Sequence, residues 1–213
     1  MTRKLAECTA RRFFRFSLRW LLLAVALVAV LLALVIPTVE SRRHSAKCDL
    51  CKGNLHQVGS AAVGYFTAHG RFPPAYTFDS NGKRMHSWRV QILPYLGPEA
   101  VALYNRYNFN EPWDSPSNQR LADKMPSVFC CPFQPSTSVP SYFAVTRDGE
   151  LGYLAGVDGA RKLQLLIEVL NRNVNWLSPY GDVKPDEVAA IRSKTKIEGH
   201  QNGIIEAPIL PTP

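Results

Sequence analysis

The sequence contains two close pairs of cysteines: Cys48 and Cys51 in a C-x-x-C spacing, and Cys130 and Cys131 as direct neighbours. Cysteines at such spacings bind zinc, carry out thiol–disulfide exchange, or form structural disulfides. Because neighbouring residues of an extended chain point to opposite faces, Cys130 and Cys131 are poorly placed to bind one tetrahedral ion together. A redox motif is expected where a strand leads into a helix, which is not the setting of Cys48 and Cys51.

The other candidates for chemistry are histidines and carboxylates. None of the five histidines lies in an H-E-x-x-H motif or near a G-x-S-x-G motif. His86 precedes Ser87, but adjacent side chains seldom face each other. Glu111 and Asp114 could serve acid–base chemistry or bind calcium, although the proline and tryptophan between them predict a rigid loop in which Asp114 caps the next helix. We therefore predict no catalytic residue, cofactor or metal, and a hydrolase site around His86, Asp114 or His200 is the alternative.

A run of seventeen apolar residues, Trp20 to Ile36, precedes all of these groups. A helix over residues 16–37 would be roughly 30 Å long, which matches the hydrocarbon thickness of a bilayer. A buried core helix rarely stays apolar on every face for so long, and a cleaved signal peptide has a shorter apolar region followed by a small-x-small site. We therefore predict an uncleaved transmembrane helix over residues 16–37.

The charge distribution predicts the orientation of this helix. Eight of the 25 Lys and Arg residues lie at or before Arg43, and six of them precede the apolar run. The positive-inside rule then keeps the basic tail, residues 1–15, in the cytoplasm of a bacterial cell and places the rest outside the cytoplasmic membrane. Beyond Arg43 the net charge is only +2 of the total of +8, which argues against nucleic acid as a partner. Membrane lipid is the expected partner of the N-terminal helix.

This topology places four of the five cysteines, Cys48, Cys51, Cys130 and Cys131, beyond the membrane in an oxidising space, and leaves Cys8 in the cytoplasm. An even number of cysteines in such a compartment favours one or two structural disulfides over thiols, zinc or redox catalysis.

The membrane helix is predicted to continue as an amphipathic helix over residues 38–70. Its apolar positions recur every three or four residues, at Cys51, Leu55, Val58, Ala62 and Tyr65. A C-cap glycine, Gly70, followed by two prolines predicts the end of this helix.

Residues 71–207 are predicted to form one extracytoplasmic α+β domain, and residues 208–213 a proline-rich tail. Asn81-Gly82 predicts a hairpin turn, and KLQLLIEVL is ambiguous between strand and helix. Short helices are predicted in SWRVQILPYL, PEAVALYNRY, DSPSNQRLADKM and PDEVAAIRSK, and strands in SVFCC, SYFAV and LGYLAG.

Several separate motifs in a fixed order carry a family resemblance from about Pro37 to Gly203. They are CKGNLHQVGSAAVGYFTAHGRFPPAY, HSWRVQILPYL, FNEPWDSPSNQRL, FCCP, Asp158-Gly159 with IEV and Trp176, and GHQNG. On these motifs the chain resembles the bacterial family called domain of unknown function 1559, whose usual members look like type II secretion pseudopilins.

The resemblance implies a pilin-like fold, in which a mainly antiparallel sheet packs on the second half of a long N-terminal helix. It also implies that Cys51 and Cys131 match the usual cysteines of the family and pair with each other, while Cys48 and Cys130 are additions that form a second bridge. Structural roles are implied for the remaining motif residues, which are His86, Trp88, Pro94, Trp113, Asp114, Pro132, Asp158, Gly159, Glu168, Trp176, His200 and Gly203.

The N-terminus departs from the pattern of the family. Usual members begin with a prepilin-peptidase signal, but RRFFRFSLRWLLLAVALVAV has no glycine before its apolar run and no glutamate near its start. We therefore expect a membrane-anchored structural or binding protein that does not polymerise. A minor pseudopilin of a secretion system is the alternative, and other envelope or pseudopilin-like proteins are the expected protein partners.

Overall fold

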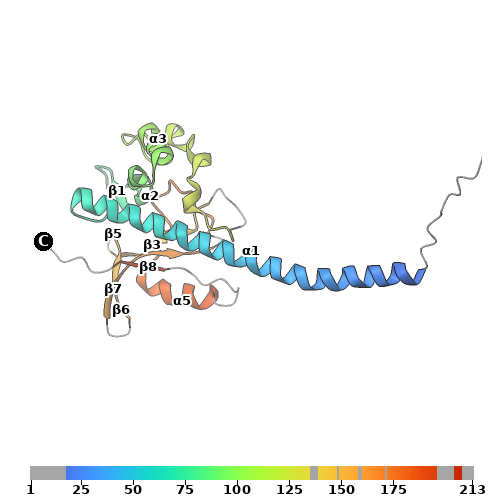
Figure 1. The fold of residues 1–213 in the computed structure, drawn as a ribbon. Helices are drawn as coiled ribbons and strands as arrows, with labels where there is room; N and C mark the ends of the chain where they lie inside the picture. The colour runs from blue at the N-terminus through green and yellow to red at the C-terminus, as the bar shows by residue number, and fades with distance from the viewer. Residues whose placement is uncertain are drawn as a thin grey trace, which may run out of the picture. The chain divides into compact units, whose positions relative to one another are not determined.

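The computed structural model describes residues 18–134, 139–147, 149–157, 160–170, 172–195 and 204–207. The chain divides into two compact units, residues 1–45 and 46–213. One helix, α1 (Leu18–His69, 52 residues), begins in the first unit and ends in the second (Figure 1).

The part of α1 that belongs to the first unit is mainly apolar and is exposed along its described length. Every residue from 18 to 45 is exposed, and its most apolar stretch of 18 residues has a mean hydropathy of 3.0 with none of it buried. The helix continues through Pro37. It is therefore long and apolar enough to cross a membrane, as the sequence predicts.

In the second unit, α1 buries one face. The predicted stripe is confirmed, because all of its residues are buried: Cys51, Leu55, Val58, Ala62 and Tyr65. Two small residues, Gly59 and Ala61, are buried beside them. The helix ends as predicted at Gly70, whose φ of 71° is a left-handed conformation that glycine adopts without strain. The Gly70 amide donates to Phe66 O at 2.8 Å.

A hairpin and a series of short helices follow α1. The bounds are β1 Tyr76–Phe78, β2 Arg84–Ser87, α2 Trp88–Gln91, η1 Leu93–Tyr95, α3 Pro98–Arg106, α4 Pro116–Gln119, η2 Ala122–Lys124 and η3 Ser127–Phe129. β1 and β2 pair in an antiparallel arrangement around the predicted Asn81-Gly82 turn, and Pro98 begins α3 as predicted.

Two local predictions are wrong. The SVFCC segment forms η3 rather than a strand, because Cys130 N bonds back to Ser127 O at 3.0 Å after Pro126. Asp114 does not cap α4; the Ser115 hydroxyl does, by accepting from Asn118 N. Ser115 directly precedes the first helical residue, which is the position where a side-chain oxygen reaches the unpaired amides.

The central strand of the main sheet is β7 (Ala160–Glu168), so the ambiguous KLQLLIEVL segment is mostly a strand. It pairs in an antiparallel arrangement with β3 (Tyr142–Ala144), β6 (Tyr153–Val157) and β8 (Ile204–Ala207). A separate pair, β4 (Thr146–Arg147) and β5 (Glu150–Leu151), is also antiparallel.

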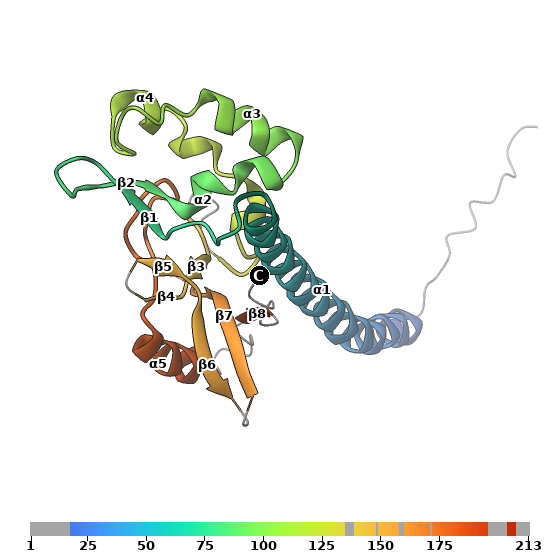
Figure 2. The same ribbon diagram turned by 90° about the vertical axis from the view of Figure 1, so that its left-hand side faces the viewer.

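Helices cover both faces of the main sheet (Figures 1 and 2). On one face Tyr142, Ala144 and Leu166 join the buried stripe of α1 in the larger apolar core. On the other face Phe143 and Ile167 pack with Val188 of α5 (Pro185–Thr195) in a smaller core. Alternation along β3 therefore directs successive side chains into two cores. The protein has the predicted α+β class, with a long N-terminal helix packed on an antiparallel sheet.

A buried ion pair joins α2 to the segment before α5. The guanidinium of Arg89, which is 0% exposed, lies 3.5 Å from Asp182 Oδ1 and donates to Tyr142 O at 2.8 Å. Asp182 Oδ1 also accepts from Trp88 Nε1 and from Ala144 N, each at 3.1 Å. Burial raises the pKa of Asp182 and lowers the pKa of Arg89, and each charge partly offsets the effect on the other.

Candidate functional site

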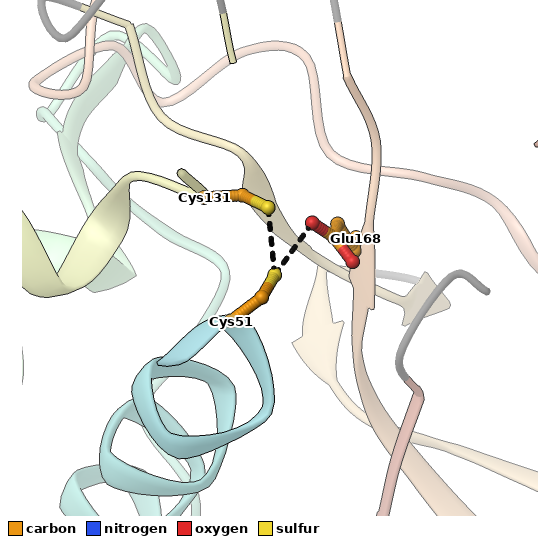
Figure 3. A group of neighbouring side chains, drawn as sticks. All are labelled: Cys51, Cys131 and Glu168. Carbon is orange, nitrogen blue, oxygen red and sulfur yellow. Dashed lines mark hydrogen bonds between the residues drawn. The ribbon is translucent and has the colours of Figure 1, made fainter. Parts of the chain in front are cut away.

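Four side chains from distant parts of the sequence meet where α1 crosses the sheet, and we call them the thiol cluster: Cys51, Cys131, Tyr142 and Glu168. Cys51 lies on α1, Cys131 follows η3, and Tyr142 and Glu168 are register partners on β3 and β7. Figure 3 shows Cys131 and Glu168 on either side of the Cys51 sulfur. The four residues are between 0% and 3% exposed, so the cluster is part of the core.

Cys51 is the centre of the thiol cluster. Its Sγ lies 2.7 Å from Cys131 Sγ, 2.8 Å from Glu168 Oε1 and 3.1 Å from the Tyr142 hydroxyl. Tyr142 also donates to Cys51 O at 3.1 Å. A disulfide bond is about 2.05 Å long, so a small movement of either side chain brings the two sulfurs to bonding distance.

Hydrogen bonds to Ser141 hold Cys131 at this place. Cys131 N donates to Ser141 Oγ at 2.9 Å, and Ser141 N donates to Phe129 O at 2.8 Å. Ser141 O in turn accepts from Val169 N, directly after β7. The segment that carries Cys131 is thereby fixed to the start of β3, opposite Cys51.

The electrostatics of the thiol cluster do not suit thiol catalysis. The hydrogen bond with Cys51 raises the pKa of Cys131, and burial and Glu168 raise it further. Burial and the contact with Cys51 also raise the pKa of Tyr142. Catalytic cysteines combine a lowered pKa with partial exposure, whereas buried structural cysteines are inert. The arrangement therefore suits a structural pair.

Cys51, Cys131 and Glu168 also offer three metal-ligand atoms within 4.8 Å of one another. Two thiolates bound at about 2.3 Å to a tetrahedral zinc ion would be roughly 3.8 Å apart. The 2.7 Å between the two sulfurs is far shorter and fits a sulfur–sulfur bond better. Among the described residues no second group of metal-ligand atoms of this kind is found. The sulfurs of Cys48, Cys51, Cys130 and Cys131 do not gather into a four-cysteine metal site.

Cys48 and Cys130 are half-buried. Burial raises the pKa of the Cys130 thiol, and Cys130 O accepts from Asn54 Nδ2 at 3.0 Å. A second bridge between Cys48 and Cys130 stays a prediction.

His86 is buried and held at both ring nitrogens. Nδ1 lies 2.9 Å from the Tyr107 hydroxyl and Nε2 lies 3.1 Å from Phe109 O. Since a carbonyl can only accept, Nε2 carries the proton, and a neutral ring then accepts from Tyr107 at Nδ1. Burial lowers the pKa of His86, and the bond to Phe109 O opposes this in part. The ring is engaged in packing and is not presented to a substrate.

We expect His86 to make the protein less stable in mild acid. Because the folded-state pKa lies below the ordinary value of about 6.5, the unfolded chain binds more protons and stability falls as the pH drops through this range. Urea unfolding between about pH 7.5 and 5 should show this loss in the wild type and a flatter profile in His86→Gln. His56→Gln, at an exposed position on α1, is the control and should follow the wild type. If His86→Gln and the wild type lose stability equally in mild acid, His86 is not the group responsible for the loss.

The remaining groups of the hydrolase alternative do not gather around His86. Asp114 pairs with Lys83 at 3.8 Å on the surface, where the two side chains are 46% and 55% exposed. Glu111 accepts from the Ser117 hydroxyl, and this bond lowers the pKa of Glu111. His200 lies outside the described residues.

The other motif residues take the following places. Trp88 and Trp176 are fully buried, and Trp176 Nε1 donates to Ala122 O at 2.9 Å. Trp113 packs against the larger core, and Pro94 and Pro132 are half-buried. Asp158, Gly159 and Gly203 lie outside the described residues.

Sequence reasoning missed the partners of these residues. Tyr142, Ser141 and Asp182 were not singled out, although each makes hydrogen bonds that fix the thiol cluster or the Arg89 guanidinium. The alternation of SYFAV indicates which residues share a face with Tyr142, but no local pattern indicates that Asp182 will meet Arg89, 93 positions earlier.

The fold defines a class of protein: an α+β domain that follows an apolar N-terminal helix long enough to cross a membrane. The chain belongs to the family described as protein of unknown function (DUF1559), whose model matches residues 41–164. The matched range includes Cys51, Cys131 and Tyr142, whereas Glu168 lies four residues beyond it. No curated protein and no solved structure matches the chain.

Proposed function

We propose that this protein is a single-pass, membrane-anchored scaffold or binding protein with a pilin-like extracytoplasmic domain, which a Cys51–Cys131 disulfide ties to its helix. Residues 16–37 cross the bacterial cytoplasmic membrane, with the basic tail in the cytoplasm. Residues 38–70 continue the helix, and residues 71–207 form the rest of the domain outside.

One observation carries this proposal: the change of character along α1. Residues 18–45 are exposed on every face although they include the most apolar stretch of the chain, which is unfavourable in water but not in lipid. From Cys51 onward a single stripe is buried by the domain. Together with the positive charges before the apolar run, this change favours a helix whose first part is inserted in a membrane and whose second part packs against the domain.

The proposed domain is structural and does not polymerise. The chain lacks the glycine and the glutamate that mark the usual pseudopilin start. The described residues of the hydrolase alternative, His86 and Asp114, are engaged with Tyr107 and Lys83 respectively. These observations favour a scaffold over a filament subunit or a hydrolase.

The orientation can be tested with Ser80→Cys, at an exposed position in the turn of the β1–β2 hairpin. A membrane-impermeant maleimide added to intact spheroplasts should label this cysteine, whereas native Cys8 should react only after the membrane is dissolved. Wild-type protein is the control for background labelling of the other cysteines. Alkaline carbonate should leave the full chain in the membrane pellet. Labelling of Cys8 but not of residue 80 in intact spheroplasts, or release by carbonate, would contradict the proposal.

A further inference from the structure

A cavity of about 340 Å³ lies at the C-terminal end of α1, beside β1, α2, η1, α3 and the segment that follows α3. We call it the aromatic pocket, and its lining includes Tyr65, Thr77, Gln91, Tyr95, Tyr104 and Phe109. Its volume is at the lower end of the range for small-molecule sites. Neither the thiol cluster nor His86 lines it, so the roles described above do not account for it.

Aromatic rings make up much of the lining. The rings of Tyr65 and Tyr95 meet edge to face, with centroids 6.1 Å apart and an interplanar angle of 72°. The rings of Tyr104 and Phe109 have centroids 5.0 Å apart. Tyr65 is buried, Tyr95 and Tyr104 are half-buried, and Phe109 is exposed. Because the face of an aromatic ring carries partial negative charge, exposed ring surface attracts C–H groups with partial positive charge.

The polar side chains of the aromatic pocket are incompletely bonded. Thr77 Oγ1 is buried and has no hydrogen-bond partner in the part of the chain that the structure describes. Gln91 accepts from the Tyr65 hydroxyl and donates to Pro74 O, each at 3.4 Å, which is longer than an ordinary hydrogen bond. Since an unbonded buried hydroxyl is costly, a ligand that bonds to Thr77 gains free energy.

Thr77 lies at an irregularity of the β1–β2 hairpin. Tyr76 pairs with Ser87 and Phe78 with Arg84, so the pairing advances two positions on β1 and three on β2. This extra residue of β2 makes a β-bulge, a feature that re-aims side chains and is common beside functional sites. The next residue, Phe78, is 60% exposed and does not line the aromatic pocket.

The aromatic pocket favours a ligand without charge. Among the described residues, no Asp, Glu, Lys or Arg side chain lines it. Burial raises the pKa of Tyr65, Arg71 opposes this, and Tyr95 and Tyr104 raise it further. The Tyr65 hydroxyl therefore stays protonated at neutral pH. An anion or a cation would lose its hydration here without gaining a counter-charge from the lining.

We propose that the aromatic pocket binds a neutral pyranose sugar, either free or at the end of a glycan. A pyranose with equatorial hydroxyls, such as glucose or N-acetylglucosamine, has flat faces of C–H groups that stack on aromatic rings. Its hydroxyls both donate and accept, which suits Thr77 and Gln91. A quaternary ammonium group would also lie against aromatic rings, but it has no hydrogen to donate to Thr77 Oγ1.

The test uses the purified full chain in a polyoxyethylene detergent, because many common detergents carry a sugar head group. Saturation-transfer NMR detects binding of methyl β-glucoside, of N-acetylglucosamine and of short β-linked oligomers of both sugars, and titration gives the dissociation constants. The wild type should bind at least one of these sugars saturably, and choline should not displace it. Tighter binding of an oligomer than of its monomer identifies the end of a glycan as the ligand, and equal binding identifies a free sugar.

Two variants test the stacking and the polar contact separately. Phe109→Ala removes an exposed ring of the lining and should weaken sugar binding about tenfold. Phe78→Ala, the matched control outside the pocket, should leave binding unchanged. Thr77→Val keeps the shape of the side chain and removes the unbonded hydroxyl. It should weaken binding about fivefold without lowering the midpoint of urea unfolding.

A wild type that binds none of these sugars saturably would overturn the inference, and so would unchanged affinity in both Phe109→Ala and Thr77→Val. Binding of choline in place of the sugars would overturn it as well, because it would identify a site for cations. If Phe109→Ala does not fold, Thr77→Val and the titration of the wild type still decide. The inference depends neither on the proposed anchor nor on the disulfide, so its failure leaves the proposed function in place.

Discussion

Reduction of the proposed Cys51–Cys131 disulfide is expected to lower the free energy of unfolding of the α+β domain by about 4 kcal/mol. The bridge closes a loop of 80 sequence positions, and the chain-entropy model assigns about 4.5 kcal/mol to a loop of this size. For a domain of this size the loss corresponds to roughly 10 °C in the midpoint of thermal unfolding. Urea unfolding with and without a reductant, followed by tryptophan fluorescence, measures it.

Two variants make this prediction specific to one pair. Cys51→Ala with Cys131→Ala should be about as unstable as the reduced wild type, and a reductant should change it little. Cys48→Ala should keep the sensitivity to reductant. If peptide mapping shows both cysteines reduced while the unfolding midpoint is unchanged, the pair does not stabilise the domain.

Asp182→Asn is expected to cost about 3 kcal/mol, because it leaves the buried Arg89 guanidinium without its counter-charge. The asparagine oxygen can still accept from Trp88 Nε1 and Ala144 N, so the loss reports mainly on charge. Burial already raises the pKa of Asp182 despite the adjacent cation, which indicates that desolvation outweighs the attraction. We therefore expect Arg89→Met combined with Asp182→Asn to regain most of the loss.

The matched control is the exposed pair of Lys83 and Asp114, at 3.8 Å. Lys83→Met should change the free energy of unfolding by less than about 1 kcal/mol, since water screens exposed charges. Urea unfolding of the single and double variants provides the measurement. An Asp182→Asn effect as small as that of Lys83→Met would show that the buried pair is not important for stability.

The sequence predicts the long helix and its buried stripe because both depend on periodicity. The apolar run from Trp20 and the three-and-four spacing from Cys51 are local patterns, and each appears in the structure as predicted. Periodicity does not predict the close approach at Gly64 of the same helix, where a Cβ would lie 3.0 Å from the ring of Tyr95 in η1.

The thiol cluster could be predicted only in part. The resemblance to the family implies that Cys51 pairs with Cys131 and marks Glu168 as a structural residue, but no spacing indicates that Glu168 meets the two cysteines, since α1, the segment after η3 and β7 are far apart in the sequence. The prediction of a strand at SVFCC failed because apolar content does not report the turn that follows Pro126. The ion pair of Arg89 and Asp182 has no local signal, because it depends on how α2 packs against the segment before α5.

If the bridge forms, α2, α3, α4 and the three short η helices all lie within a covalent ring that starts on α1 and closes after η3. A protease that cuts the backbone once within this ring cannot separate the pieces, so the nicked chain stays anchored and migrates as two fragments only after reduction. A protein displayed among secreted proteases could thus lose a peptide bond in one of its loops and still remain attached to the cell.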